Sequence, residues 1–183
     1  MDNRPLRLVW VDLEMTGLDP ETCVIVEIAV VITGADLAPI AELERVVWQP
    51  DEALARMDPF VRAMHEKSGL DGRIRASKTS LRDAERDVMA LVTTHCAFRE
   101  GVLAGNSIHQ DRRFLARHMP LLEGSLHYRQ VDVSSLKVLA EAWYGPRAKY
   151  AKDGKTHTAL DDIRGSIAEL AHYRQSLFVK PAP

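Results

Sequence analysis

Near its N-terminus the chain reads Val9-Trp10-Val11-Asp12-Leu13-Glu14-Met15-Thr16-Gly17-Leu18-Asp19-Pro20. This pattern predicts an apolar strand that carries two acids in its last residues and ends at a Thr-Gly turn. Residues i and i+2 of a strand project from the same face, so Asp12 and Glu14 point the same way. Two carboxylates on one face of a buried strand repel each other and are costly to desolvate. A divalent cation would offset that cost, and we expect one beside this strand.

Two more strand signals follow this stretch. Residues 23–32 form a strongly β-branched run, and residues 43–48 form a shorter one. The connections between the three runs are short and contain Gly, Asp and Pro, as hairpin loops do. The first third of the chain therefore predicts an antiparallel three-stranded meander.

The pattern then alternates between helix and strand. Asp58-Pro59 can begin one helix, and Ser80 is a predicted N-cap for another that reaches His95. Three strands followed by alternating strands and helices predict an α/β fold. In this fold, helices flank a mixed sheet made of the meander and two parallel strands. We expect one domain over residues 1–183. Further along we expect strands at 102–105 and 127–133, and helices at 109–118, 134–143 and 158–178.

Composition limits the class of protein. The chain has 183 residues, of which 46% are hydrophobic, enough for one well-formed core. No run approaches the roughly 18 apolar residues of a membrane span, and no signal peptide opens the sequence. Cys23 and Cys96 lie far apart without metal-binding spacing and are expected to be free thiols. These features predict a cytoplasmic protein.

The charge is small but unevenly distributed. A net charge of −2 argues against a protein that grips long nucleic acid through counterion release. Residues 1–60 hold four Lys/Arg against twelve Asp/Glu, whereas residues 61–183 hold twenty against fourteen. Such asymmetry fits an ordinary solvated surface. It also fits an acidic metal-binding edge that faces basic groups able to meet a phosphate.

Two later stretches carry further candidate groups. In Gly105-Asn106-Ser107-Ile108-His109-Gln110-Asp111, the polar residues either cap the following helix or join the first acids. In His157-Thr158-Ala159-Leu160-Asp161-Asp162, a histidine precedes two acids at the start of the last helix. Acids are common at helix N-termini because of the helix dipole. Asp161 can pair with Arg164 at i+3, which leaves Asp162 for an inward role.

Taken together, these motifs resemble the DEDDh family of 3′-to-5′ exonucleases, which have a ribonuclease H-like fold. Asp-x-Glu, a mid-chain Asp and His-x4-Asp occur here in the order and spacing of that family. The likeness extends through the blocks 12–18, 105–111, 128–129, 132–134 and 159–164, which are similar to the branch that degrades very short RNA. The five matching positions are Asp12, Glu14, Asp111, His157 and Asp162.

The resemblance implies a site for two divalent ions, Mg²⁺ or Mn²⁺. Asp12 would bridge the ions, and Glu14, Asp111 and Asp162 would complete their shells. Carboxylates are the hard oxygen ligands that such ions prefer, and two ions can hold the attacking and leaving oxygens of an in-line displacement. His157 would be the general base, since an imidazole pKa of about 6.5 lies near working pH.

The same resemblance implies how the 3′ end is held. Leu18 and Phe60 would lie around the terminal bases, with His65 nearby. That branch of the family usually has Trp at the position of Phe60, so the stacking area is smaller here. For Leu18 and Phe60 the alternative is ordinary core packing.

Four residues match positions that close around the 5′ end: Ser107, Tyr128, Arg129 and Ser134. The resemblance implies a homodimer in which the second subunit supplies some of them. Arg129 suits a terminal phosphate because its planar fork can donate two charge-assisted hydrogen bonds. Ser134 can equally be a helix N-cap.

We therefore expect a 3′-to-5′ exoribonuclease that cuts RNAs of a few residues, dinucleotides included, to 5′-mononucleotides. One alternative is a DEDDh proofreading exonuclease that acts on DNA; Met15 and the block 128–134 favour the RNA enzyme. Another is an RNA-binding module without catalysis, which the presence of all four acids and His157 disfavours.

Overall fold

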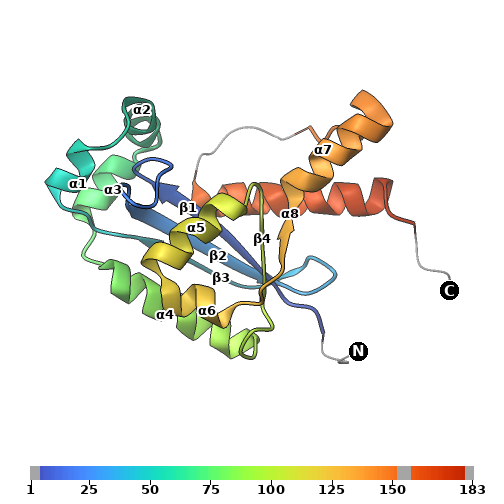
Figure 1. Cartoon of the computed structure of the whole chain (residues 1–183), viewed down its shortest axis with the longest axis horizontal. Coiled ribbons are helices and arrows are strands. Elements are labelled where there is room, and N and C mark those ends of the chain that lie inside the picture. The colour runs from blue at the N-terminus through green and yellow to red at the C-terminus, as the bar shows by residue number, and fades with distance from the viewer. Residues whose placement is uncertain (1–4, 152–157, 180–183) are drawn as a thin grey trace.

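The computed structural model describes residues 5–151 and 158–179, so the predicted base His157 lies outside the described residues. Its centre is a five-stranded mixed sheet with the order β3-β2-β1-β4-β5 (Figure 1). β1 pairs antiparallel with β2 and parallel with β4. The predicted meander and the two parallel strands are therefore confirmed. The strands are β1 (Leu8–Met15), β2 (Ile25–Thr33), β3 (Pro39–Val46), β4 (Val102–Gly105) and β5 (Gln130–Asp132).

The two edge strands differ from their predicted bounds. β3 begins at Pro39, four residues earlier than predicted, because the antiparallel pairing with β2 extends as far as Thr33 opposite Pro39, through mostly exposed residues. β5 covers three residues in place of the predicted 127–133. The carbonyl groups of His127 and Tyr128 accept hydrogen bonds from the Arg112 side chain, so this part of the segment is held by a side chain.

The longer predicted helices are confirmed and three short helices were missed. Ser80 caps α4 as predicted by accepting from the Asp83 N–H, and α2 begins at the predicted place with Asp58 as its N-cap, which accepts from the Phe60 and Val61 N–H groups. The short helices α1, α3 and α6 have five to seven residues, too few for an apolar period to show in the sequence. The helices are α1 (Asp51–Ala55), α2 (Pro59–Ser68), α3 (Leu70–Ala76), α4 (Leu81–His95), α5 (His109–His118), α6 (Pro120–Ser125), α7 (Val133–Tyr144) and α8 (Ala159–Ser176), with a 3-10 turn at Gly145–Ala148.

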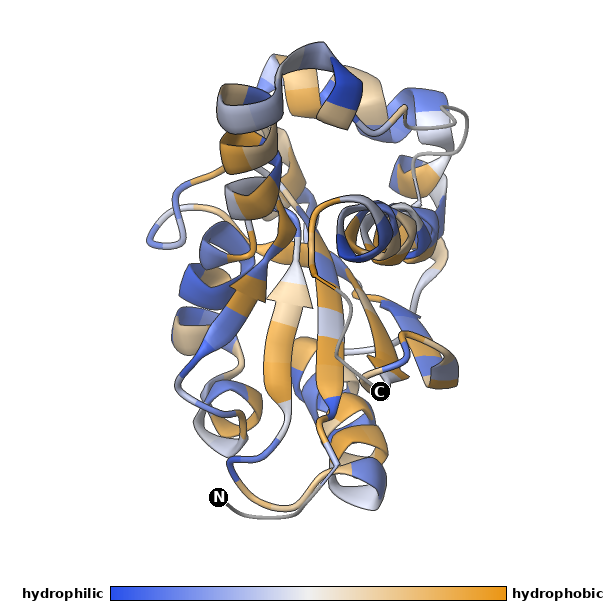
Figure 2. Cartoon of the chain, turned by 90° about the vertical axis from the view of Figure 1, so that its right-hand side faces the viewer, coloured by the Kyte–Doolittle hydropathy of each residue, from blue (hydrophilic) through white to orange (hydrophobic). Residues whose placement is uncertain are grey.

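Helices cover both faces of the sheet. Val9, Val11 and Leu13 of β1 pack with residues of α4, α5 and α6. Leu8 and Trp10, which point the other way, pack with residues of α7 and α8. The colouring of Figure 2 shows the resulting concentration of hydrophobic residues along the strands. Alternation along one strand thus places Asp12 and Glu14 on the α8 side.

No helix among residues 5–151 and 158–179 is long and apolar enough to cross a membrane.

Candidate active site

Three carboxylates meet where β1 ends. Asp12 and Glu14 project from the same face of the strand, and Asp162 comes from the first turn of α8. One oxygen from each lies within 4.8 Å of the other two. Asp161 is turned elsewhere, because it accepts hydrogen bonds from Thr158 at 2.8 Å and Arg164 at 3.3 Å. The structure therefore separates the two adjacent acids as the sequence predicted.

Asp111 approaches the same strand from α5. Its Oδ1 accepts a hydrogen bond from the backbone N–H of Leu13 at 3.0 Å, and the side chain is buried. Burial raises the pKa of Asp111 to about 7, although the Leu13 hydrogen bond acts in the opposite direction. Asp111 does not belong to the set of oxygens within 4.8 Å, but its charge acts on Glu14. It lies beside the three-carboxylate cluster and is attached to the backbone between Asp12 and Glu14.

Glu14 shows most clearly that the site is arranged for a cation. Burial, together with repulsion from Glu27, Asp162 and Asp111, raises its pKa to about 7. Oxygen ligands of one Mg²⁺ lie about 2.1 Å from the ion, hence up to about 4.2 Å apart. A spacing of up to 4.8 Å needs only a small side-chain movement to reach that geometry. The donor set and its charge therefore fit a divalent metal.

The close packing of β4 against β1 brings α5 to this place. Gly105 ends β4, and a Cβ there would lie 3.0 Å from the Val11 carbonyl oxygen and 2.8 Å from Ile108 Cδ1. Only glycine permits that approach without movement of the neighbours. α5 then begins four residues later, at the distance from which Asp111 reaches Leu13.

Leu18 and Phe60, two of the three residues predicted for the 3′ end, lie exposed on elements that meet beyond the end of β1. Leu18 is 68% exposed and Phe60 is 74% exposed, so the alternative that they are core residues is wrong. The turn that carries Leu18 is joined to α2 by a hydrogen bond from Asp58 N–H to the Thr16 carbonyl at 3.2 Å. The structure thus brings both side chains to neighbouring elements.

His65 has a different environment from the other predicted substrate residues. It is 2% exposed, and its Nε2 donates to the Met15 carbonyl at 3.0 Å. Its Nδ1 lies 3.9 Å from Glu14 Oε2. His65 therefore holds α2 against the end of β1, directly behind a metal-ligand candidate.

Ser107 and Ser134 form a hydrogen-bonded pair at the ends of β4 and β5. The Ser107 N–H donates to Ser134 Oγ at 2.9 Å and to Asp132 Oδ1 at 3.0 Å. Ser107 has a φ of 50°, an uncommon left-handed conformation for serine that these contacts hold in place. The helix-capping alternatives are wrong: Ile108 is the N-cap of α5 with no side-chain cap, and Asp132 is the N-cap of α7.

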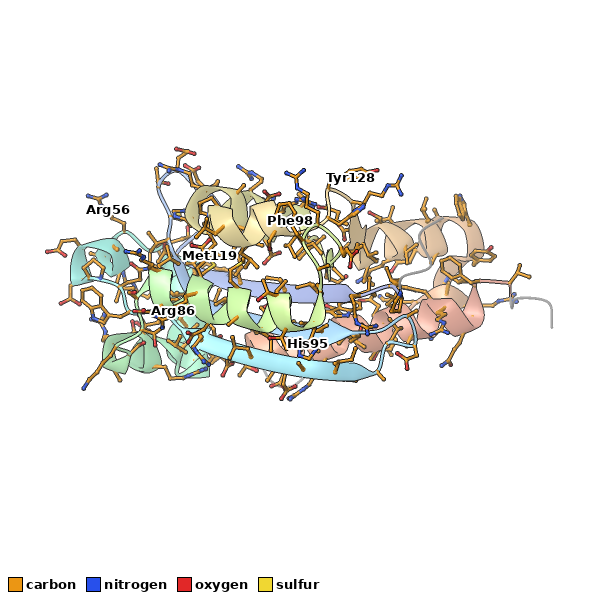
Figure 3. All side chains as sticks on the ribbon, turned by 90° about the horizontal axis from the view of Figure 1, so that it is seen from below. Arg56, Arg86, His95, Phe98, Met119 and Tyr128 are labelled. Carbon is orange, nitrogen blue, oxygen red and sulfur yellow. The ribbon has the colours of Figure 1, made fainter. Side chains whose placement is uncertain are left out.

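Tyr128 and Arg129 lie at the other end of β5. Asp132 ends this strand beside the serine pair, and three residues of strand span about 10 Å. Tyr128 is 72% exposed and lies on the outer surface (Figure 3), with the Arg129 guanidinium 5.2 Å from its ring centroid. The structure therefore places this pair away from the serines of the same chain.

Three polar residues of the site were not among the predicted ones. Glu27 faces Glu14 directly in the β1–β2 register and pairs with Arg73 at 2.8 Å. Asp132 accepts from both serine N–H groups, and Asn106 connects Ser134 to α8. A charged residue in the middle of an apolar strand was the available signal for Glu27. Asp132 and Asn106 lie in the blocks 132–134 and 105–111, in which Ser134, Ser107 and Asp111 were the residues given a role.

Comparisons with known proteins agree on the family. A family model described as RNase_T exonuclease matches residues 9–170. Among curated relatives, the oligoribonuclease of Pseudomonas aeruginosa strain PAO1 is 50% identical, covering 96% of this chain and 98% of that protein. The oligoribonuclease of Pseudomonas syringae pv. tomato is 52% identical over 95% and 97% of the two chains. That of Corynebacterium efficiens is 54% identical over 97% and 82%.

Solved structures support the ribonuclease H-like fold. Exonuclease I of E. coli, in complex with a 5cy-dT13 oligonucleotide, has a TM-score of 0.73 at 14% identity and covers 95% of this chain. Exonuclease I of Methylocaldum szegediense has a TM-score of 0.72 at 17% identity and covers 94%. This chain spans about two fifths of those longer proteins, 42% and 41% respectively. At such low identity the likeness concerns the fold alone.

Proposed function

The chain belongs to the RNase_T exonuclease family and is a 3′-to-5′ exoribonuclease, and from this premise we propose that its substrates are very short RNAs, dinucleotides included. The products are 5′-mononucleotides. The observation that carries the proposal is the carboxylate cluster at the end of β1, in a chain that matches oligoribonucleases over nearly their full length.

The enzyme uses divalent metal, and we propose that it holds two ions, Mg²⁺ or Mn²⁺. Bound there, the ions supply charge neutralisation at the phosphate and an acidified water as nucleophile. Asp12, at the centre of β1, is proposed as the shared ligand. Glu14 and Asp162 complete the cluster from β1 and α8, and Asp111 contributes from the α5 side.

His157 is the proposed general base. It precedes the N-cap residue of α8 by one position, and Asp162 lies in the first turn of that helix. A neutral imidazole accepts a proton from the attacking water and releases it afterwards, because its pKa of about 6.5 lies near working pH.

Contacts at both ends of the substrate account for the proposed preference for short RNA. Leu18 and Phe60 offer apolar surface to the 3′-terminal bases, with His65 supporting the end of β1. Ser107 and Ser134 are proposed to receive the 5′ phosphate, together with Arg129 and Tyr128. A protein with a net charge of −2 can act on RNA in this way, since it holds a short piece by its ends.

We propose that the active form is a homodimer. The strand β5, about 10 Å long, separates Tyr128 and Arg129 from Ser107 and Ser134 of the same chain. This separation favours a site in which the partner subunit supplies the Tyr128 and Arg129 side chains. α7 extends outward from the sheet (Figure 1) and exposes Val138, Trp143 and Tyr144. Exposed apolar patches are typical of protein interfaces.

A Trp143→Glu variant should become monomeric by light scattering and lose activity on dinucleotides, whereas full activity in a monomer would contradict the proposal.

We further propose a single exonuclease domain that acts in the cytoplasm. Two of the hydrophobic clusters among the described residues cover opposite faces of one sheet, which favours one folding unit for residues 1–183. Cys23 and Cys96 are both free thiols, as is usual in reducing compartments.

The experiment that tests the function compares three substrates in the presence of Mg²⁺. A 5′-phosphorylated diribonucleotide, a single-stranded RNA of about 30 residues and a DNA of the same sequence are each incubated with the enzyme. The proposal predicts fast cleavage of the diribonucleotide and a much lower kcat/KM for both long strands. Preference for the long DNA would favour a proofreading-type enzyme, and binding without cleavage of any substrate would favour a non-catalytic module.

A further inference from the structure

Glu169 of α8 is a buried acid for which the reaction described above has no role. It is 5% exposed. Its Oε1 accepts a hydrogen bond from the Tyr173 hydroxyl at 2.9 Å, and its Oε2 accepts one from the Asn106 amide at 3.1 Å. Burial and the contact with Glu169 hold the pKa of Tyr173 above its ordinary value, so Tyr173 is a donor at all working pH values. A buried carboxylate with two donors on separate oxygens is a fixed acceptor.

The second partner of Asn106 on α8 is an acceptor as well. The Asn106 Nδ2 donates to Ser166 Oγ at 2.9 Å. Ser166 uses its own proton on the Asp162 carbonyl, also at 2.9 Å, so its oxygen accepts from Asn106. Both contacts on the helix side require the NH2 group of the amide, which turns the Asn106 carbonyl oxygen away from α8.

That carbonyl oxygen sets the direction of the serine pair. Ser134 Oγ donates its proton to Asn106 Oδ1 at 3.0 Å. Because this proton is committed, Ser134 Oγ accepts from the Ser107 N–H at 2.9 Å and from the Ser107 hydroxyl at 3.2 Å. Donation therefore runs in one direction, from Ser107 through Ser134 and Asn106 to Glu169. The Ser107 hydroxyl stands at the start of this chain, so its proton is the one that can turn from Ser134 to a phosphate oxygen, while the Ser107 N–H stays on Ser134 Oγ.

We propose that Glu169 is a positioning residue for the 5′ phosphate, acting through Asn106 on the Ser107–Ser134 pair. The inference rests on the proposed function, in which this pair receives the 5′ phosphate. Ser166 alone fixes the Asn106 amide less firmly, since its hydroxyl is an acceptor only while it donates to the Asp162 carbonyl and could turn to donate to a flipped amide. The carboxylate has acceptors only and keeps one orientation.

The test measures discrimination at the 5′ end. The ratio of kcat/KM for a 5′-phosphorylated diribonucleotide to kcat/KM for the same diribonucleotide with a 5′ hydroxyl is determined for each enzyme. In Glu169→Gln an NH2 group can face Asn106 and allow the flipped amide. We expect the ratio to fall by about tenfold, mainly through KM for the phosphorylated substrate, as the loss of one charge-assisted hydrogen bond implies.

Two further variants separate positioning from general damage. Asn106→Ala removes the same link from the other side and is expected to lower the ratio similarly, even if Glu169→Gln folds poorly. Glu85→Gln is the matched control: Glu85 is also a buried acid with two hydrogen bonds, from the N–H groups of Leu121 and Leu122, but it lies on α4 across the sheet. It should lower thermal stability and leave the ratio unchanged.

The outcomes distinguish this inference from the function beneath it. A wild-type ratio well above one that is retained in both Glu169→Gln and Asn106→Ala would overturn the role of Glu169 and leave the proposed function standing. Equal losses on both substrates would assign Glu169 a structural role only and equally overturn the inference. A wild-type ratio near one would remove the 5′-phosphate site itself, and the role of Glu169 with it.

Discussion

Two polar regions of the molecule differ in how their groups are partnered. At the end of β1, the carboxylates of Asp12, Glu14 and Asp162 face one another, with Asp111 beside them. Around Ser107 and Ser134, each donor faces an acceptor in one hydrogen-bonded chain. In the first region, burial and the repulsion between the acids raise the pKa of Glu14 to about 7. In the second, Glu169, Asn106, Ser134 and Ser107 are joined by hydrogen bonds of 2.9 to 3.2 Å. The acidic region needs bound cations to offset its repulsion, whereas the serine region is already hydrogen-bonded before the 5′ phosphate binds. Substitutions in the two regions should therefore differ in kind.

The largest effect is expected for Asp162→Asn, which removes a charge from the acidic region. Loss of one carboxylate should lower kcat by about a thousandfold, equivalent to about 4 kcal/mol in the barrier. The measurement is single-turnover cleavage of a diribonucleotide at saturating Mg²⁺. Asp161→Asn is the matched control because Asp161 bonds to Thr158 and Arg164. Comparable losses in both variants would refute the separation of the two acids.

The second prediction concerns the proton acceptor. His157→Ala should lower kcat by about a hundredfold or more while leaving KM close to wild type, as expected for a general base. The pH profile of kcat should lose its acidic limb in the variant. Retention of both kcat and that limb would exclude His157 as the base.

The third prediction uses stability to contrast the two regions. A carboxyl group whose folded pKa is raised binds more protons in the folded state, so the free energy of unfolding falls as pH rises through the window between the two pKa values. For Glu14 that window runs from 4.5 to about 7. Metal-free Glu14→Gln should therefore be more stable than wild type by up to about 3 kcal/mol at pH 7.5.

This stabilisation should disappear at pH 4, where Glu14 is protonated in both folded and unfolded states, and Mg²⁺ should stabilise wild type more than the variant. Chemical denaturation with and without EDTA measures both. By contrast, Glu169→Gln should destabilise at every pH, because it disturbs satisfied hydrogen bonds. A metal-free Glu14→Gln protein less stable than wild type at pH 7.5 would contradict the raised pKa of Glu14.

The smallest effect is expected for Phe60, which is proposed to contact the 3′-terminal bases. Phe60→Ala should raise KM for a diribonucleotide by about tenfold, since base stacking is worth about 1–3 kcal/mol. Phe60→Trp should lower KM by a smaller factor because the ring is larger. Stability should hardly change in either, as Phe60 is exposed. An unchanged KM in Phe60→Ala would remove this residue from the binding surface.

The acidic region could be predicted from sequence more completely than the serine region. Asp12 and Glu14 lie two positions apart on a strand, so their shared face follows from strand geometry. The exclusion of Asp161 followed from its spacing to Arg164. Glu169 could not be found in this way, because an acid on a helix usually lies on the solvated face. Its burial depends on the packing of α8 beside Asn106, which is 63 positions away in the sequence.

The same contrast holds for the fold. The meander is formed by neighbouring segments, and its order and pairing were predicted, with the start of β3 placed four residues too late. The extent of β5 depends on Arg112, whose side chain binds the carbonyl groups of residues 127 and 128. His65 was expected near the substrate, yet its burial against Met15 depends on how α2 folds back over β1. Contacts between distant segments decide these features.

If divalent cations complete the end of β1, the bound ions can be counted. Metal-free protein is titrated with Mn²⁺ at pH 7.5 in the presence of a non-hydrolysable diribonucleotide, and bound ions are counted by equilibrium dialysis. We predict two ions per chain for wild type, fewer for Asp162→Asn and two for Glu169→Gln. Absence of saturable Mn²⁺ binding in wild type, or an unchanged count in Asp162→Asn, would contradict the account.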